Sequence, residues 1–297
     1  MRKILITLVF LGVIAAGVAW WLTGPERLPD DAMAGLTGDA ARGETVFYAG
    51  GCASCHAAPD AADDAMLVLA GGRALVSDFG TFYAPNISPD MDHGIGSWSA
   101  LDLANAMKQG VSPQGQHLYP AFPYTTYTRA SLQDIADLYA FLRTLPADAT
   151  PNRAHDIGFP FNIRRALGGW KLLFLNDDWV QEDVESEALK RGRYLVEALG
   201  HCAECHTPRN AIGGLDTMRW LGGAPNPSGQ GEIPNITSGA LGWSEEEVAE
   251  YLTSGFTPDF DVVGGEMADV VSNIAHLDDA DRAAIAAYVK AVPAVTN

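Results

Sequence analysis

Basic residues are scarce in this chain. Its 297 residues include 19 Lys and Arg against 37 Asp and Glu, which gives a formal net charge of −18. Because nucleic acids are bound mainly through Lys and Arg contacts to phosphate, this balance excludes nucleic acid as a partner. A solvated acidic surface explains the charge, and electrostatic steering of a basic partner protein is the sharper interpretation.

Long apolar runs are absent except for one near the N-terminus. Residues 4–22 carry no charge and follow Arg2 and Lys3. Their length is close to the roughly 20 residues of a membrane-crossing helix, and the preceding cations orient the rest of the chain outward. A cleaved signal peptide is the alternative, but Trp20 and Trp21 suit a membrane interface better than a protease site. We therefore expect residues 1–24 to be an uncleaved inner-membrane anchor, with the body in the periplasm.

Cysteine is rare, and its four copies form two pairs with none left over. Cys52 and Cys55 precede His56, and Cys202 and Cys205 precede His206. Disulfides, or zinc sites of two cysteines and a histidine, would explain the pairs alone. A histidine next to a cysteine, however, is a poor chelating geometry for one tetrahedral ion. Thioredoxin-like chemistry would need a βαβ context, which is not evident.

Each pair with its histidine is the C-x-x-C-H pattern of c-type haem attachment. Cysteines three apart on a helical turn face one side and reach the two vinyl groups of one porphyrin. The following imidazole is then placed to bond the iron from beneath the ring. The sequence thus predicts two covalently bound haem c groups, with His56 and His206 as iron ligands.

An internal repeat places each motif in its own domain. Asn86 and Asn235 lie in matching Pro-Asn-Ile segments, and each segment is followed by a Trp-Ser pair. Ser99 and Ser244 have an acidic residue three positions on, which predicts a helix start, and a glycine 11 residues on, which predicts its end. Amphipathic stretches at residues 132–145 and 278–292 close the two halves. Sustained strand alternation is absent, so we expect an all-α fold with a haem domain at residues 41–147, a connector at 148–187 and a second haem domain at 188–297.

The repeat also indicates the sixth ligand of the second haem. Met267 lies nine residues after Pro258, in a glycine-containing loop expected before the last helix. A thioether opposite the histidine holds low-spin iron six-coordinate and raises its potential, which suits electron transfer. Core filling is the alternative for any methionine.

The same offset in the first half leads to Phe122, which cannot bind iron. The first haem then either has an open distal position or takes another ligand. Met107, one turn before the end of the predicted 99–110 helix, is the leading candidate, although its counterpart Leu252 indicates a core position. His117 would give a bis-histidine site. Weaker candidates are Met66, Met91 and His93.

Other residues near the motifs have two interpretations each. Asn86, Asn235, Arg73 and the indoles of Trp98 and Trp243 either hydrogen-bond haem propionates or serve loop and core structure. In the connector, residues 168–175 are rich in apolar side chains. We expect this stretch to be core under the interdomain contact; the alternative is a helix lying on the membrane.

With these residues in view, the chain resembles the membrane-anchored cytochrome c subunits of bacterial periplasmic alcohol, aldehyde and gluconate-type dehydrogenases. The matching segments cover nearly the whole exported body: residues 86–90, 94–96, 117–121, 159–162, 200–202 and 207–210. The resemblance implies class I cytochrome c domains and electron relay between an oxidoreductase and the respiratory chain. Two departures are the count of haem motifs, two rather than the usual three, and Phe122 where many relatives have methionine. Relatives with phenylalanine there often have methionine at the position of Met107 as well.

We therefore expect a membrane-tethered dihaem cytochrome that transfers electrons from a periplasmic dehydrogenase or other donor to a soluble cytochrome or terminal oxidase. The rival hypothesis is a dihaem enzyme of the peroxidase or thiosulfate-oxidising type. That hypothesis uses a first haem with an open distal side, and His117 is its one plausible acid or base. A third interpretation is a subunit whose haems work only inside a dehydrogenase or oxidase complex.

Overall fold

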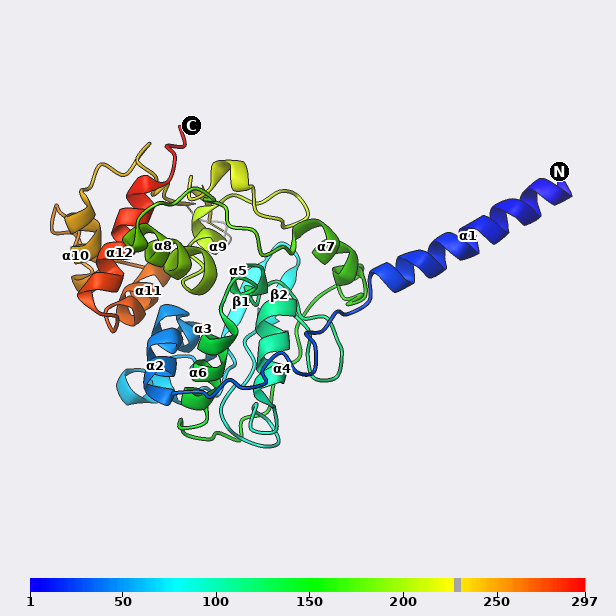
Figure 1. Ribbon diagram of the computed structural model, residues 1–297, viewed down its shortest axis with the longest axis horizontal. Coiled ribbons are helices and arrows are strands. Elements are labelled where there is room, and N and C mark those ends of the chain that lie inside the picture. The colour runs from blue at the N-terminus through cyan, green and yellow to red at the C-terminus, as the bar shows by residue number, and fades with distance from the viewer. Residues whose placement is uncertain (227–230, 297) are drawn as a thin grey trace.

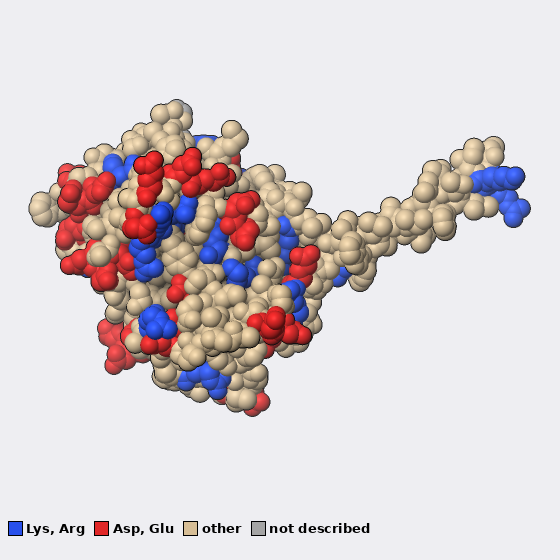
Figure 2. All heavy atoms as spheres, viewed as in Figure 1, with Lys and Arg blue, Asp and Glu red and all other residues tan. Residues whose placement is uncertain are grey.

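A helical body with one projecting helix makes up the computed structural model, which describes residues 1–226 and 231–296 (Figure 1). Helix α1 (Arg2–Leu22) leaves the body and buries none of its residues. It has 21 residues and a mean hydropathy of 2.4, which suits a membrane span by length and composition. Figure 2 shows positive side chains at its free end and no charge along its length.

The body consists of two halves in which helices follow the same order. The first half contains α2 (Ala40–Ala49), α3 (Cys52–His56), α4 (Ala100–Ala104) with a π-helical continuation (Asn105–Gln109), α5 (Tyr124–Tyr127) and α6 (Leu132–Leu142). The second half contains α8 (Glu187–Tyr194) with a π-helical continuation (Leu195–Leu199), α9 (Ala203–His206), α10 (Glu245–Ser254), α11 (Glu266–Ile274) and α12 (Asp279–Ala291). The predicted mostly helical fold with two tandem domains is confirmed.

The first and last helices of each half cross at a glycine. A Cβ on Gly43 of α2 would lie 1.9 Å from the carbonyl oxygen of Asp137 in α6. A Cβ on Gly192 of α8 would lie 2.0 Å from the carbonyl oxygen of Ala284 in α12. Only glycine permits so close an approach of two backbones, so the same helix crossing holds each half together.

An arginine beside each of these glycines ties the crossing helices with a two-pronged ion pair. Arg42 donates to both carboxylate oxygens of the buried Asp137, at 2.7 and 2.9 Å. Arg191 does the same to Asp281, at 2.7 Å to each oxygen. Burial alone would raise the pKa of Asp137, but the hydrogen bond from Arg42 lowers it overall. The Arg-Gly pair that recurs in both halves is therefore a sequence signal of this helix crossing.

The predicted helix boundaries around the repeat are confirmed. Ser99 and Asp102 form a capping box at the start of α4, and Ser244 and Glu247 form one at α10. The Ser131 side chain likewise accepts from the backbone of the third residue on. Gly110, with φ +56°, and Gly255, with φ +77°, end the two middle helices in the left-handed conformation.

Short antiparallel hairpins are the main addition to the expected fold. Strands β1 (Ala74–Ser77) and β2 (Gly80–Tyr83) pair in the first half, and β3 (Ala224–Pro225) and β4 (Glu232–Ile233) pair in the second. Strands of four and two residues are too short to display a period of two, which is why no strand was expected.

The connector contains helix α7 (Ala166–Phe174), which lies where α1 leaves the body (Figure 1). The expectation that this stretch is core is wrong, because Leu172 and Leu173 are 60% and 67% exposed. Its contact with the second half is limited: Trp170 donates from Nε1 to the carbonyl of Ile212 at 2.8 Å, and Phe174 packs on Gly214.

Candidate haem centres

Both cysteine pairs lie on a single helical turn that begins with a residue in the left-handed region. Gly51, with φ +57°, precedes α3, and His201, with φ +42°, precedes the turn that carries Cys202. All four cysteines are free of disulfides. Among the described residues no group of His, Cys, Asp and Glu is placed to hold a metal ion alone. Free thiols three apart on one turn fit a covalently bound porphyrin rather than a zinc site.

A backbone carbonyl orients each motif histidine. The Nδ1 atom of His56 donates to the carbonyl oxygen of Pro85 at 2.8 Å, and Nδ1 of His206 donates to that of Pro234, also at 2.8 Å. This bond fixes the tautomer and leaves Nε2 as the nitrogen for iron. Burial also lowers the pKa of both imidazoles, which favours the neutral form that binds metals.

Left-handed glycines shape the loop behind each histidine in the same way. The backbone N–H of Gly71 donates to the carbonyl of His56 at 2.7 Å, and that of Gly223 donates to the carbonyl of His206 at 2.8 Å. A Cβ on Gly71 would lie 2.5 Å from the backbone of Pro85, the residue that accepts from His56. The glycine therefore allows the loop to hold the proline carbonyl against the imidazole.

The first motif is in direct contact with the second half of the body. The hydroxyl of Ser54, inside Cys-Ala-Ser-Cys-His, accepts from Nδ2 of Asn273 in α11 at 2.9 Å. Arg73 donates to the carbonyl of Ser54 and to Asp269 of α11, the latter at 2.8 Å. Helix α11, which carries Met267 in its first turn, is thus fastened to the first haem motif.

The second motif makes the converse contact with the first half. Glu204, which occupies the place of Ser54 in Cys-Ala-Glu-Cys-His, accepts from the hydroxyls of Thr125 and Thr126 at 3.2 and 3.1 Å. These threonines lie in α5 of the first half, which corresponds in order to α11 of the second half. Glu204 also pairs with Arg209 of its own half. The two haem motifs therefore contact each other's domains in a crossed, pseudo-symmetric arrangement.

Comparison with known families matches both halves. The family model of cytochrome c matches residues 40–146, and the model of the cbb3-type cytochrome c oxidase subunit III matches residues 187–289. A dihaem cytochrome c-type protein of Cereibacter sphaeroides is 57% identical over 99% of this chain and 100% of its own length.

The chain belongs to the dihaem c-type cytochromes.

Its more distant relatives are parts of dehydrogenases. The fructose dehydrogenase cytochrome subunit of Gluconobacter japonicus and the quinone alcohol dehydrogenase cytochrome c subunit of Gluconobacter oxydans are each 37% identical to it. The matches cover 85% and 86% of this chain. The chain therefore spans about half of each relative, 52% and 55% of their own lengths. This dihaem cytochrome is thus homologous to electron-transfer subunits of membrane dehydrogenases, and it carries two haem c groups.

The candidate sixth ligand of the second haem differs from expectation in its setting. Met267 lies in the first turn of α11 rather than in a loop, and it packs, half-buried, against the apolar core of the cytochrome. Gly265, with φ +60°, starts that helix without a side-chain cap. A helix that begins without a capping side chain leaves little sequence signal, which is why α11 was not expected.

The candidate for the first haem is held rigidly. Met107 is 5% exposed, within the π-helical turn that ends the middle helix of the first half. Lys171 of α7 donates to the carbonyls of Gln109 and Gly110 at 2.5 and 2.7 Å, and Lys108 donates to those of Thr128 and Ala130. π-Helical turns occur often at functional sites. Phe122 packs against the apolar core that contains Met107, and its ring centroid lies 5.5 Å from that of Tyr127.

The other candidates are engaged or face elsewhere. The Nε2 atom of His117 is hydrogen-bonded to the carbonyl of Thr23 at 3.0 Å, so this ring nitrogen faces the end of α1. Met91 is 61% exposed, and His93 pairs with Asp90 in the same loop at 3.4 Å. Met66 packs, half-buried, at the edge of the core.

Both asparagines of the repeat donate to backbone carbonyls. The amide of Asn86 donates to the carbonyls of Asp148 and Thr150 at 2.8 and 3.0 Å, which uses both of its hydrogens. Asn235 donates to the carbonyl of Val295 at 2.8 Å. Each asparagine thus ties the end of its half to the loop behind the proximal histidine.

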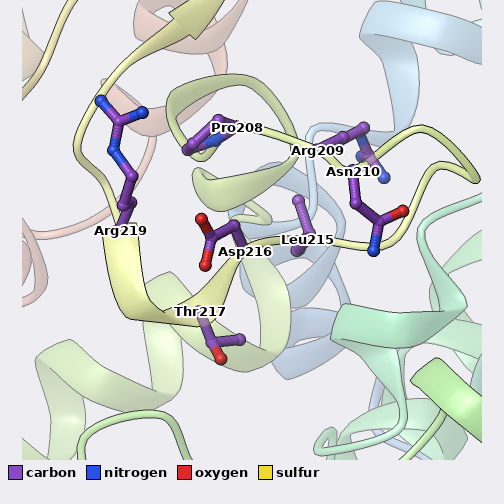
Figure 3. A pocket seen from close by; sticks show the side chains of 7 residues that line it. All are labelled: Pro208, Arg209, Asn210, Leu215, Asp216, Thr217 and Arg219. Carbon is purple, nitrogen blue, oxygen red and sulfur yellow. The ribbon is translucent and has the colours of Figure 1, made fainter.

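A separate hollow of about 400 Å³ lies in the loop after His206 (Figure 3). Figure 3 shows Asp216 at its centre, with Arg219 on one side and Arg209 and Asn210 on the other. Its lining is mostly polar, and none of the haem-attachment residues belongs to it. It is therefore a surface hollow of the second domain, whose lining begins two residues after His206.

Proposed function

We propose that this cytochrome is tethered to the inner membrane by α1 and carries electrons in the periplasm from a dehydrogenase or other donor to a respiratory acceptor. When bound, the two haems supply reversible one-electron chemistry. The observation that carries the proposal is the crossed contact of the two motifs, through Ser54 with Asn273 and Glu204 with Thr125 and Thr126. These contacts fasten each attachment turn to a helix of the other domain, which supports a relay between two centres.

The proposed iron ligands are His206 with Met267 in the second domain, and His56 with Met107 in the first. A thioether at both sixth positions closes the iron to substrates and favours a high reduction potential. For Met107, the support is its burial and the two lysines that fix its helical turn. For Met267, the support is its place at the start of a helix that is fastened to the first motif.

Optical spectra with carbon monoxide test the proposal, since this ligand binds only iron with an open or displaceable sixth position. We expect the reduced wild-type cytochrome to keep its spectrum under carbon monoxide, and the oxidised form to show the iron–methionine charge-transfer band. Carbon monoxide binding to one haem of the wild type would contradict the carrier assignment and favour the peroxidase or thiosulfate-oxidising alternative.

Two conservative substitutions assign the ligands separately. Met107→Leu introduces the residue that the second half has at this place, Leu252, so packing is nearly kept. We expect it to open one haem to carbon monoxide and Met267→Leu to open the other, whereas Met66→Leu serves as a control that opens neither. An unchanged spectrum for Met107→Leu removes Met107 as a ligand.

A further inference from the structure

An apolar surface is exposed in the connector of this strongly acidic protein. Phe159 is 81% exposed, Phe161 47%, Ile163 46%, and Leu172 and Leu173 of α7 are 60% and 67% exposed. Single exposed apolar residues are ordinary, but several large ones within 15 residues of chain form a surface that water disfavours. Such a surface calls for an occupant.

The end of α1 is fastened to this same stretch of the connector. Gly168 of α7 approaches Thr23 so closely that a Cβ would lie 2.1 Å from the Thr23 carbonyl oxygen. The Arg165 guanidinium lies 4.1 Å above the ring of Trp20 and donates to the Trp20 carbonyl. The residues in which a spanning helix would leave the bilayer, Trp20 to Thr23, are therefore packed directly against α7 (Figure 1).

The charge of this stretch differs from that of the rest of the chain. No acidic residue occurs from Ile157 to Leu175, although the whole chain has 37 acidic residues. This stretch contains Arg164 and Arg165 near the surface, whereas its Lys171 is buried and donates to backbone carbonyls. Figure 2 shows acidic side chains over much of this face of the body, with a group at the end away from α1, where Figure 1 places α10 and α12, and others near the base of α1. Anionic phospholipid surfaces attract basic segments and repel acidic ones.

We infer that the connector surface formed by Phe159, Phe161, Ile163, Leu172 and Leu173 docks on the bilayer beside α1, with its apolar side chains among the lipid headgroups. The inference rests on the proposed retention of α1 as an anchor. A helix with exposed leucines and basic neighbours, fixed to the end of a spanning helix, fits the interface plane. The docked connector fixes the orientation of the body, so that the acidic α10 and α12 side faces away from the membrane.

A cysteine substitution reports on the docking. Haem attachment consumes the four native cysteines, so Leu172→Cys supplies the one reactive thiol of the full-length, haem-loaded cytochrome. The protein is placed in nanodiscs of phosphatidylethanolamine and phosphatidylglycerol, without any partner protein, and treated with a charged, membrane-impermeant maleimide. Phe260→Cys is the matched control, because Phe260 is an apolar residue of the second half that is 86% exposed.

We expect Leu172→Cys to react at least about tenfold more slowly than Phe260→Cys in nanodiscs, as burial in the headgroup region implies, and at an equal rate after unfolding. Equal rates in the folded, nanodisc-bound protein would overturn the docking while leaving the anchor intact. Slow reaction in native membranes but fast reaction in nanodiscs would mean that a protein partner covers the surface, and would also overturn it. An intact mass that lacks residues 1–24 would refute the anchor itself, and the docking with it. Neither result affects the carbon monoxide test of the haem ligands.

Discussion

One exchange of a buried residue gives the cores of the two haem domains different chemistry. Five residues before the first motif cysteine stands Phe47 in the first half and Glu197 in the second, and both are fully buried. Phe47 packs on Phe141 with ring centroids 5.2 Å apart. Glu197 instead accepts from the hydroxyl of Tyr288, which occupies the place of Phe141. Burial raises the pKa of Tyr288, so its hydroxyl stays protonated and donates to the carboxylate.

Glu197 also holds the connector by hydrogen bonds: its carboxylate accepts from the backbone N–H groups of Val180 and Gln181 at 2.7 and 3.1 Å. Glu197→Ala would leave these donors and the Tyr288 hydroxyl buried without a partner, at about 1–3 kcal/mol each. We expect a loss of at least about 3 kcal/mol in the free energy of unfolding, measured by guanidinium titration of the haem-loaded protein. Tyr288→Phe, which removes one donor and keeps the two backbone bonds, should cost only about 1–2 kcal/mol. Equal losses for the two variants would show that the carboxylate is not the centre of this network.

The helix crossings are the elements on which each half depends. Gly43→Ala or Gly192→Ala would drive a methyl group into a backbone carbonyl, at 1.9 or 2.0 Å in the present geometry. The crossing helices would have to separate, which weakens the Arg42–Asp137 or Arg191–Asp281 ion pair as well. We expect each substitution to destabilise the cytochrome by about 3 kcal/mol or more, at or beyond the upper end of ordinary overpacking. Gly242→Ala, whose Cβ would meet nothing within 4 Å, should stay within about 0.5 kcal/mol of wild type when all three variants are compared by thermal unfolding.

Local signals of the sequence were enough to predict many of these elements. Ser99 and Ser244 predicted helix starts because a capping side chain acts within three residues. Gly110 and Gly255 predicted helix ends because glycine readily takes the left-handed conformation that follows a helix. The haem motifs are likewise local. The contact of Ser54 with Asn273 joins residues 219 positions apart, and no short-range pattern announces it. The exposure of Leu172 was also beyond prediction, since an apolar helix face looks the same in sequence whether protein or membrane covers it.

At the scale of the whole molecule, the two domains meet at His201, a histidine whose pKa is lowered by burial. His201, directly before the second motif, is hydrogen-bonded through Nε2 to the carbonyl of Gly50 in the first half at 3.2 Å. Its ring also packs edge-on against that of Tyr127, with centroids 6.0 Å apart. Burial lowers the pKa of His201, although the nearby Glu204 carboxylate opposes this effect. Burial lowers the pKa of His117 and His155 as well.

These shifts set the direction in which stability depends on pH. A histidine whose pKa is lower in the folded state binds fewer protons there than in the unfolded chain, whose value is about 6.5. The stability that such a histidine contributes is therefore fully present above about pH 6.5. It is lost as the pH falls from there toward the pKa of the histidine in the folded state. We expect the thermal midpoint of the cytochrome to be lower at pH 5.5 than at about pH 7.5. His201→Asn, which suits the left-handed backbone at this position, should show a smaller drop between these pH values than wild type, each pKa difference of one being worth about 1.4 kcal/mol. An identical drop in wild type and variant would mean that protonation of His201 does not loosen the contact between the two haem domains.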